Sequence, residues 1–140
     1  MTENNEKTLK VALIGIGGMG YCHYCCYDDI PGAEIIAVCD VRADMAKEKI
    51  EKHAAEKSVS SAAVPRVYAN LDELLQNETP DAVDICTPSY MHADMAVKCL
   101  EKGINVLCEK PMTLCEADAA RVLAAEKKSG KKFMAAPVGR

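Results

Sequence analysis

Short apolar runs alternate along the chain with longer segments in which charged residues interrupt the apolar pattern. The runs predict six buried strands, at residues 10–14, 34–40, 66–68, 81–86, 105–108 and 132–136. The segments between them have helix-forming composition and predict helices at residues 19–28, 42–57, 71–76, 92–101 and 114–128. Alternation of this kind is typical of a parallel sheet covered by helices on both faces. We therefore expect an α/β fold, a doubly wound parallel sheet with strand order 3-2-1-4-5-6.

The first predicted strand runs directly into a glycine-rich turn with the spacing G-x-G-x-x-G. We expect Gly15 to turn the chain sharply, Gly17 to let the backbone approach a phosphate, and Gly20 to let the next helix pack closely. That helix would direct its free N–H groups at the anion. The lysine of the hydrolase-type phosphate loop is absent. The turn therefore predicts a pyrophosphate site formed by Gly15, Ile16, Gly17, Gly18, Met19 and Gly20.

An acidic residue, Asp40, ends the second predicted strand twenty residues after Gly20. A carboxylate at this position would accept hydrogen bonds from adenosine ribose hydroxyls and repel a 2′-phosphate, which favours NAD over NADP. Arg42 keeps NADP open, because a nearby arginine could bind that phosphate. The alternative interpretation is a purely structural turn followed by a helix-capping aspartate.

The length of 140 residues indicates one domain, with a polar, flexible lead-in at residues 1–9 and a dinucleotide-binding Rossmann domain at residues 10–140. No segment resembles a signal peptide, and no apolar run approaches the ~20 residues that span a bilayer. We therefore expect a cytoplasmic protein with no membrane partner. The net charge of −4, with scattered basic residues, argues against a nucleic-acid partner.

Eight cysteines are many for this length and raise the question of a metal site. Cys22 and Cys25 have C-x-x-C spacing, but no second pair completes a four-ligand set. We expect no metal, no disulfides, and mostly buried, reduced thiols. His23 and His53 have no partner at catalytic spacing, so the sequence assigns them no role.

Several sequence features together resemble the N-terminal half of the glucose-fructose oxidoreductase / inositol dehydrogenase family. They are the glycine turn, Asp40, Thr87-Pro88 followed by His92, and Glu109-Lys110-Pro111. The likeness covers about residues 10–136, and Ser89 departs from the asparagine that the family often has. The resemblance implies hydride transfer between NAD and a hydroxyl-bearing carbon of a sugar, cyclitol or related polyol.

The same resemblance implies roles for residues that follow the fourth and fifth predicted strands. Lys110 would lie beside the nicotinamide and polarise the substrate oxygen, and Glu109 would hold that lysine or contact the nicotinamide ribose. Residues at the other strand end would contact the cofactor: Thr87, Pro88, Ser89 and His92. Two alternatives stay open, namely a solvated Lys110 at the rim and a catalytic-base role for His92.

Family members carry a second α/β domain that supplies the base for the hydroxyl proton. We expect that domain to be absent from a chain that ends at Arg140, so that this polypeptide binds the dinucleotide but turns over alcohols poorly. The full-length form would be a homo-oligomer. The alternative is a stand-alone NAD-binding or sensing module without chemistry.

Overall fold

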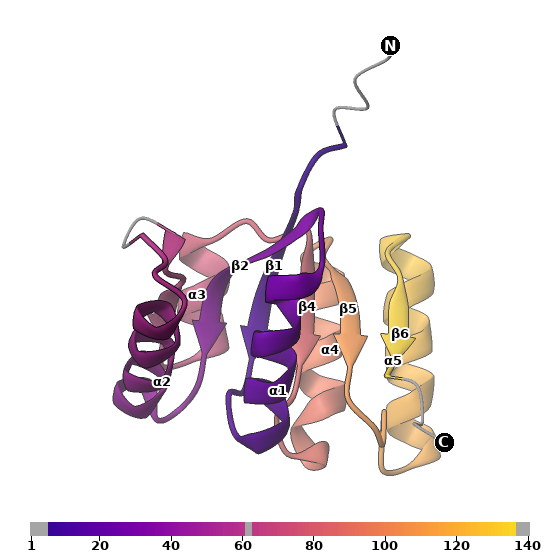
Figure 1. Cartoon of the computed structure of the whole chain (residues 1–140). Coiled ribbons are helices and arrows are strands. Elements are labelled where there is room, and N and C mark those ends of the chain that lie inside the picture. The colour runs from indigo at the N-terminus through magenta and orange to yellow at the C-terminus, as the bar shows by residue number, and fades with distance from the viewer. Residues whose placement is uncertain (1–5, 61–62, 137–140) are drawn as a thin grey trace.

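The computed structural model describes residues 6–60 and 63–136, which form one parallel sheet flanked by helices (Figure 1). Within these ranges the sheet has six strands in the order β3-β2-β1-β4-β5-β6. This order confirms the predicted doubly wound topology. The strands are β1 (Leu9–Ile14), β2 (Ala33–Cys39), β3 (Arg66–Tyr68), β4 (Ala82–Ile85), β5 (Asn105–Cys108) and β6 (Phe133–Ala135).

The helices lie on both faces of the sheet, with α1 and α2 on one face and α3, α4 and α5 on the other (Figure 1). The α-helices of the described residues are α1 (Gly18–Cys26), α2 (Ala43–Glu56), α3 (Leu71–Asn77), α4 (His92–Glu101) and α5 (Glu116–Ser129). Short 3₁₀ turns follow α1 at Tyr27–Asp29 and precede α4 at Ser89–Met91. No helix in the described ranges is long and apolar enough to cross a membrane.

Strand alternation divides the core into two clusters. Ala12 and Ile14 of β1 pack into the larger cluster with residues of α3, α4 and α5, whereas Leu13 points to the opposite face and packs with residues of α1 and α2. The same alternation applies to β4, where Val83 and Ile85 join the larger cluster. Asp84 lies between them and is 1% exposed, so it is buried on the α1 face. A carboxylate in that position requires hydrogen-bonding partners.

Most element boundaries differ from the predictions by one or two residues, and the physical reasons are local. Strand β1 begins at Leu9, because the Leu9 N–H donates to the Gly32 carbonyl (2.7 Å). Helix α5 begins at Glu116 and Leu114 is 61% exposed, so the last predicted helix started too early. Residues 1–5 of the predicted lead-in, and 61–62 and 137–140, lie outside the described residues.

The prediction of mostly buried cysteines is wrong. All eight cysteines are described and free, and only Cys39, Cys99 and Cys108 among them are buried. Burial raises the pKa of each of these three thiols to about 12. Helix α1 explains the difference, because it presents Cys22 and Cys26 to solvent and keeps Cys25 partly covered.

Candidate functional site

The glycine turn lies at the carboxyl edge of the sheet, between β1 and α1 (Figure 1). Gly15 has a φ of +88°, and a Cβ there would lie 2.9 Å from the carbonyl carbon and oxygen of Cys86. A Cβ at Gly20 would collide with the Gly15 carbonyl oxygen and lie 3.3 Å from the Cys86 Cβ. Both glycines are therefore required by the fold itself, since neither position can hold a side chain without rearrangement.

Gly17 and Gly18 differ from these two glycines. A Cβ at either position would have nothing within 4 Å. Gly17 also has a φ of −66°, which any residue adopts, and it is the N-cap of α1. Packing within the described chain therefore gives no reason for glycine at position 17. A group bound against the helix N-terminus does give one, because a Cβ would occupy the space that a phosphate needs.

Asp40 holds the turn and the start of α2 together. Its Oδ2 accepts a hydrogen bond from the Ile16 N–H (3.0 Å), and its Oδ1 accepts one from the Arg42 N–H (2.9 Å). The Ile16 side chain is fully buried, and its carbonyl accepts a hydrogen bond from Lys49 Nζ (2.9 Å). Each Asp40 oxygen retains a lone pair for a further donor, such as a hydroxyl. Lys49 is a supporting residue that the sequence reasoning missed.

A cavity of about 560 Å³ opens beside this turn. It reaches from the end of β1 across the end of β2 to the segment that follows β4. Predicted site residues that line it are Gly15, Gly17, Asp40, Arg42, Thr87 and Pro88. Its further wall residues are largely apolar and include Leu71, Met91 and Met95. An apolar cavity bordered by backbone amides and one carboxylate suits a ligand that has both a flat ring and phosphate groups.

The remaining predicted residues near α1 and α4 lie outside the cavity wall. Met19 is 54% exposed in the first turn of α1, and Ser89 begins the 3₁₀ turn before α4. His92 is 1% exposed, and its ring nitrogens lie 2.8 Å from the carbonyl oxygens of Thr87 and Pro111. The His92 ring therefore connects the segment after β4 to the segment after β5.

Glu109 and Lys110 directly follow β5, at the same edge of the sheet. The Glu109 N–H donates to the Ile85 carbonyl (2.9 Å), which extends the pairing of β5 with β4. Glu109 Oε2 accepts a hydrogen bond from the Lys110 N–H (3.1 Å), and the Lys110 side chain is exposed. The peptide bond between Lys110 and Pro111 is cis.

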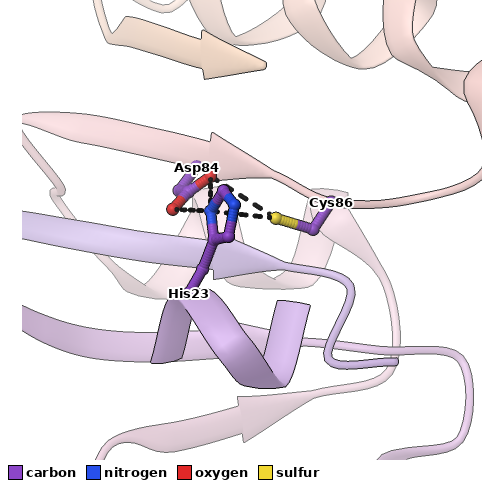
Figure 2. Close-up of side chains that lie close together, drawn as sticks. All are labelled: His23, Asp84 and Cys86. Carbon is purple, nitrogen blue, oxygen red and sulfur yellow. Dashed lines mark hydrogen bonds and ion pairs between the residues drawn. The ribbon is translucent and has the colours of Figure 1, made fainter. Parts of the chain in front are cut away.

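His23 lies between two carboxylates, so it has close partners that the sequence did not indicate. Its Nδ1 is 2.9 Å from Asp84 Oδ2, and its Nε2 is 2.9 Å from Glu109 Oε1. Figure 2 shows His23 projecting from α1 toward Asp84 and Cys86. Because each ring nitrogen meets a carboxylate oxygen, this geometry favours the protonated ring, in which both nitrogens donate. Burial opposes this charge, but Asp84 and then Glu109 outweigh it and raise the pKa of His23 above its usual value.

The partners of His23 are 61 and 86 residues away, which is why spacing along the sequence did not reveal them. One sequence signal was present, because an aspartate at position 84 within an apolar strand demands a donor. The Tyr27 hydroxyl is a second donor to Asp84 Oδ2 (3.1 Å). Cys86 Sγ is 3.4 Å from His23 Nδ1, so the cluster has metal-ligating atom types. Both ring nitrogens of His23 already pair with carboxylates. The expectation that the chain binds no metal stays a prediction.

A glycine turn at the carboxyl end of β1, an acidic residue at the end of β2 and the reversal of strand order between β1 and β4 define a dinucleotide-binding α/β domain. The chain belongs to the oxidoreductase family with an NAD-binding Rossmann fold, whose characteristic sequence it matches over residues 9–136.

Relatives and solved structures are consistent with this assignment. Inositol 2-dehydrogenase of Salmonella typhimurium is 34% identical over 128 residues, which cover 91% of this chain and 36% of that enzyme. The structure of myo-inositol 2-dehydrogenase from Lactobacillus plantarum is 26% identical, with a TM-score of 0.78 over 93% of this chain and 36% of that one. The WlbA dehydrogenase of Chromobacterium violaceum, solved with NADH and UDP-GlcNAcA, is 25% identical, with a TM-score of 0.77 over 95% of this chain and 36% of that one. The chain thus spans about a third of the length of the relatives it matches.

Proposed function

We propose that this chain binds NAD in the cavity beside the glycine turn and forms the cofactor-binding part of an oxidoreductase that acts on a sugar, cyclitol or related polyol. The observation that carries the proposal is the contrast among the glycines. The fold accounts for Gly15 and Gly20, whereas the open space at Gly17 suits a pyrophosphate against the N-terminus of α1.

The preference for NAD over NADP follows from Asp40. Its two oxygens are fixed by the backbone N–H groups of Ile16 and Arg42, so the carboxylate cannot swing out of the cavity without losing both bonds. A fixed carboxylate accepts hydrogen bonds from ribose hydroxyls and repels a 2′-phosphate. Arg42 borders the same cavity and is exposed, so it contributes the opposing attraction for a phosphate.

The carboxyl ends of β4 and β5 would hold the nicotinamide half. When bound, the nicotinamide accepts or donates a hydride. Lys110 would donate a hydrogen bond to the substrate oxygen and stabilise negative charge developing there. Glu109 is held by His23 on one oxygen and by the Lys110 N–H on the other, which fixes the backbone from which the lysine extends. The polyol substrate class rests on the family and on its inositol dehydrogenase members.

Calorimetric titration of the chain with NAD⁺ and NADP⁺ tests this proposal, with Asp40→Ala as the key variant. We expect NAD⁺ to bind about tenfold more tightly, which corresponds to about 1.4 kcal/mol. Asp40→Ala should weaken NAD⁺ binding and narrow that preference. Asp44→Ala removes a nearby exposed acid in the first turn of α2 and serves as the matched control.

Two results separate the parts of the proposal. If the folded parent chain binds neither nucleotide, the cofactor function itself is overturned. If it binds both equally, only the role given to Asp40 is lost. Circular dichroism of Asp40→Ala must match the parent, since this residue also bonds to the glycine turn.

A further inference from the structure

A second group of reactive side chains lies between α1 and α2, which share one face of the sheet (Figure 1). Cys25 Sγ on α1 is 3.8 Å from His53 Nδ1 on α2, and His53 Nε2 is 2.8 Å from Asp28 Oδ2. Asp28 belongs to the 3₁₀ turn that follows α1. None of these three residues lines the cavity beside the glycine turn. The sequence had assigned no role to His53, because Asp28 and Cys25 lie 25 and 28 residues away.

The environment of His53 fixes which nitrogen carries its proton. Asp28 can only accept at Nε2, so Nε2 donates, and in the neutral ring Nδ1 presents its lone pair to the thiol of Cys25. His53 is 5% exposed, and the Tyr24 ring packs edgewise against it with centroids 5.2 Å apart. The imidazole is therefore held in one orientation, with a thiol on one side and a carboxylate on the other. This order of groups is that of an activated cysteine nucleophile.

We propose that Cys25 is a reactive thiol that His53 and Asp28 activate for exchange with small disulfides. His53 Nδ1 accepts the Cys25 proton, and Sγ attacks one sulfur of the disulfide. A Cys25–sulfur bond forms while the disulfide bond breaks, and the departing thiolate takes the proton back from His53. The products are a mixed disulfide at Cys25 and one free small thiol, so atoms and electrons balance without a further oxidant.

The other cysteines of the first helix provide an internal comparison. Cys22 and Cys26 are both exposed, whereas Cys25 is partly covered. Exposure alone therefore predicts that Cys25 reacts more slowly than either neighbour. Cys25 also lies in the last turn of α1, where the helix dipole disfavours a thiolate. Activation by His53 reverses this expected order, which makes the proposal distinguishable from simple accessibility.

Cys86 is a thiol beside a histidine that has no free nitrogen to accept the thiol proton. Its Sγ lies 3.4 Å from His23 Nδ1, but that nitrogen is already paired with Asp84. Burial, with the negative charges of Asp84 and Glu109, raises the pKa of the Cys86 thiol. The contact between Cys25 and His53 differs, because the carboxylate of Asp28 meets Nε2 and leaves Nδ1 to the thiol.

The test measures the rate at which individual cysteines react with oxidised glutathione at pH 7, followed by mass spectrometry of peptides from the digested protein, since the exposed Cys115 is present in every variant. One variant retains Cys25 on the helix (C22S/C26S), and a second retains Cys22 (C25S/C26S). General-base assistance typically contributes about 100-fold or more, and the partial cover of Cys25 offsets part of it, so we expect Cys25 to react about tenfold faster than Cys22. His53→Gln and Asp28→Asn in the first variant should each remove most of that advantage. Lys52→Gln, which changes an exposed residue next to His53, should not.

The proposal is overturned if Cys25 reacts no faster than Cys22, or if both His53→Gln and Asp28→Asn keep the parent rate. Because His53 is buried, its variant needs a matching thermal unfolding curve, and the partly exposed Asp28 supplies the second, independent variant. NAD⁺ titration of the same proteins should be unchanged, which keeps this result separate from the cofactor function.

Discussion

The two halves of the carboxyl edge of the sheet are built from different parts of the chain. At β1 and β2, the candidate binding groups are backbone N–H groups, glycines and the carboxylate of Asp40, whose partner Ile16 is 24 residues away. At β4 and β5, they are charged side chains, and His23 reaches partners 61 and 86 residues away. The half at β1 and β2, which we call the glycine half, is specified by short sequence patterns. The half at β4 and β5, which we call the charged half, arises only when distant segments pack together.

The two halves also differ in how their polar groups are used. In the glycine half, the first N–H groups of α1 have no partner within their own helix, and a Cβ at Gly17 would have nothing within 4 Å. In the charged half, Asp84, His23 and Glu109 pair with one another. No buried side-chain nitrogen or oxygen among the described residues lacks a hydrogen-bond partner. The glycine half is thus arranged to bind a ligand, and the charged half to hold its own geometry.

The largest expected effect comes from Gly15→Ala. A residue with a Cβ is strained at a φ of +88°, and the new methyl group would press on the Cys86 carbonyl. Strain of about 1–2 kcal/mol and overpacking of about 1–3 kcal/mol together predict a loss of about 4 kcal/mol in the free energy of unfolding. Urea denaturation followed by circular dichroism measures this loss.

Gly17→Ala is the matched variant that sharpens the comparison. Its Cβ would contact nothing within 4 Å, so we expect stability to change by less than about 1 kcal/mol. Affinity for NAD⁺ should nevertheless fall by at least about tenfold, because the methyl group would occupy the phosphate space. Unchanged affinity in Gly17→Ala would show that the dinucleotide does not approach this part of the turn.

Much of the fold could be predicted from the sequence because its signals are local. The strand order follows from alternating strands and helices, and the α5 boundary at Gly130 follows from a glycine that adopts a φ of +69°. The less accurate boundary at Glu116 has a physical origin too. Leu114 and Cys115 have side chains that fit a helix, yet both lie exposed in the loop that follows Pro111.

The candidate site could be predicted only in part. Asp40 was found because the distance from Gly20 along the sequence is characteristic of a βαβ unit. The contacts of His23 with Asp84 and Glu109 bring α1 together with β4 and with the residue after β5, which no local pattern encodes. The same holds for His53, whose neighbours Cys25 and Asp28 come from the end of α1 and the turn after it.

The second-largest loss of stability is expected in the charged half. There, Asp84→Ala removes an acceptor from both His23 and Tyr27. Asp84 is 1% exposed, so its loss leaves a partly buried imidazolium with one carboxylate fewer, and we expect about 3 kcal/mol of destabilisation. Asp94→Ala is the control, because it breaks the Arg121–Asp94 pair on the surface and should cost less than about 1 kcal/mol. Equal losses in the two variants, by urea denaturation, would contradict the structural role of the Asp84 cluster.

The smallest expected effect is the pH dependence of the charged half, which the glycine half should not share. The pKa of His23 is raised in the folded protein, so folding binds a proton at this ring more tightly than the unfolded chain does. The resulting stabilisation is fully present below the unfolded pKa of about 6.5 and is lost as the pH rises through the folded pKa. His23→Gln removes this titration while keeping a side chain that can donate one hydrogen bond.

The difference in unfolding free energy between the parent and His23→Gln should therefore be largest near pH 6 and narrow toward pH 9. The loss of unfolding free energy in His23→Gln should stay below the loss in Asp84→Ala, because a neutral His23 ring still donates to one carboxylate. Proton NMR titration of the His23 ring supplies an independent measurement, and Glu109→Gln should shift its midpoint downward, since one of the two neighbouring negative charges is gone. A His23 midpoint below 6.5 in the parent protein would show that burial outweighs the two carboxylates. His23 would then be uncharged in the charged half. The two halves would differ only in how far apart their partners lie along the sequence.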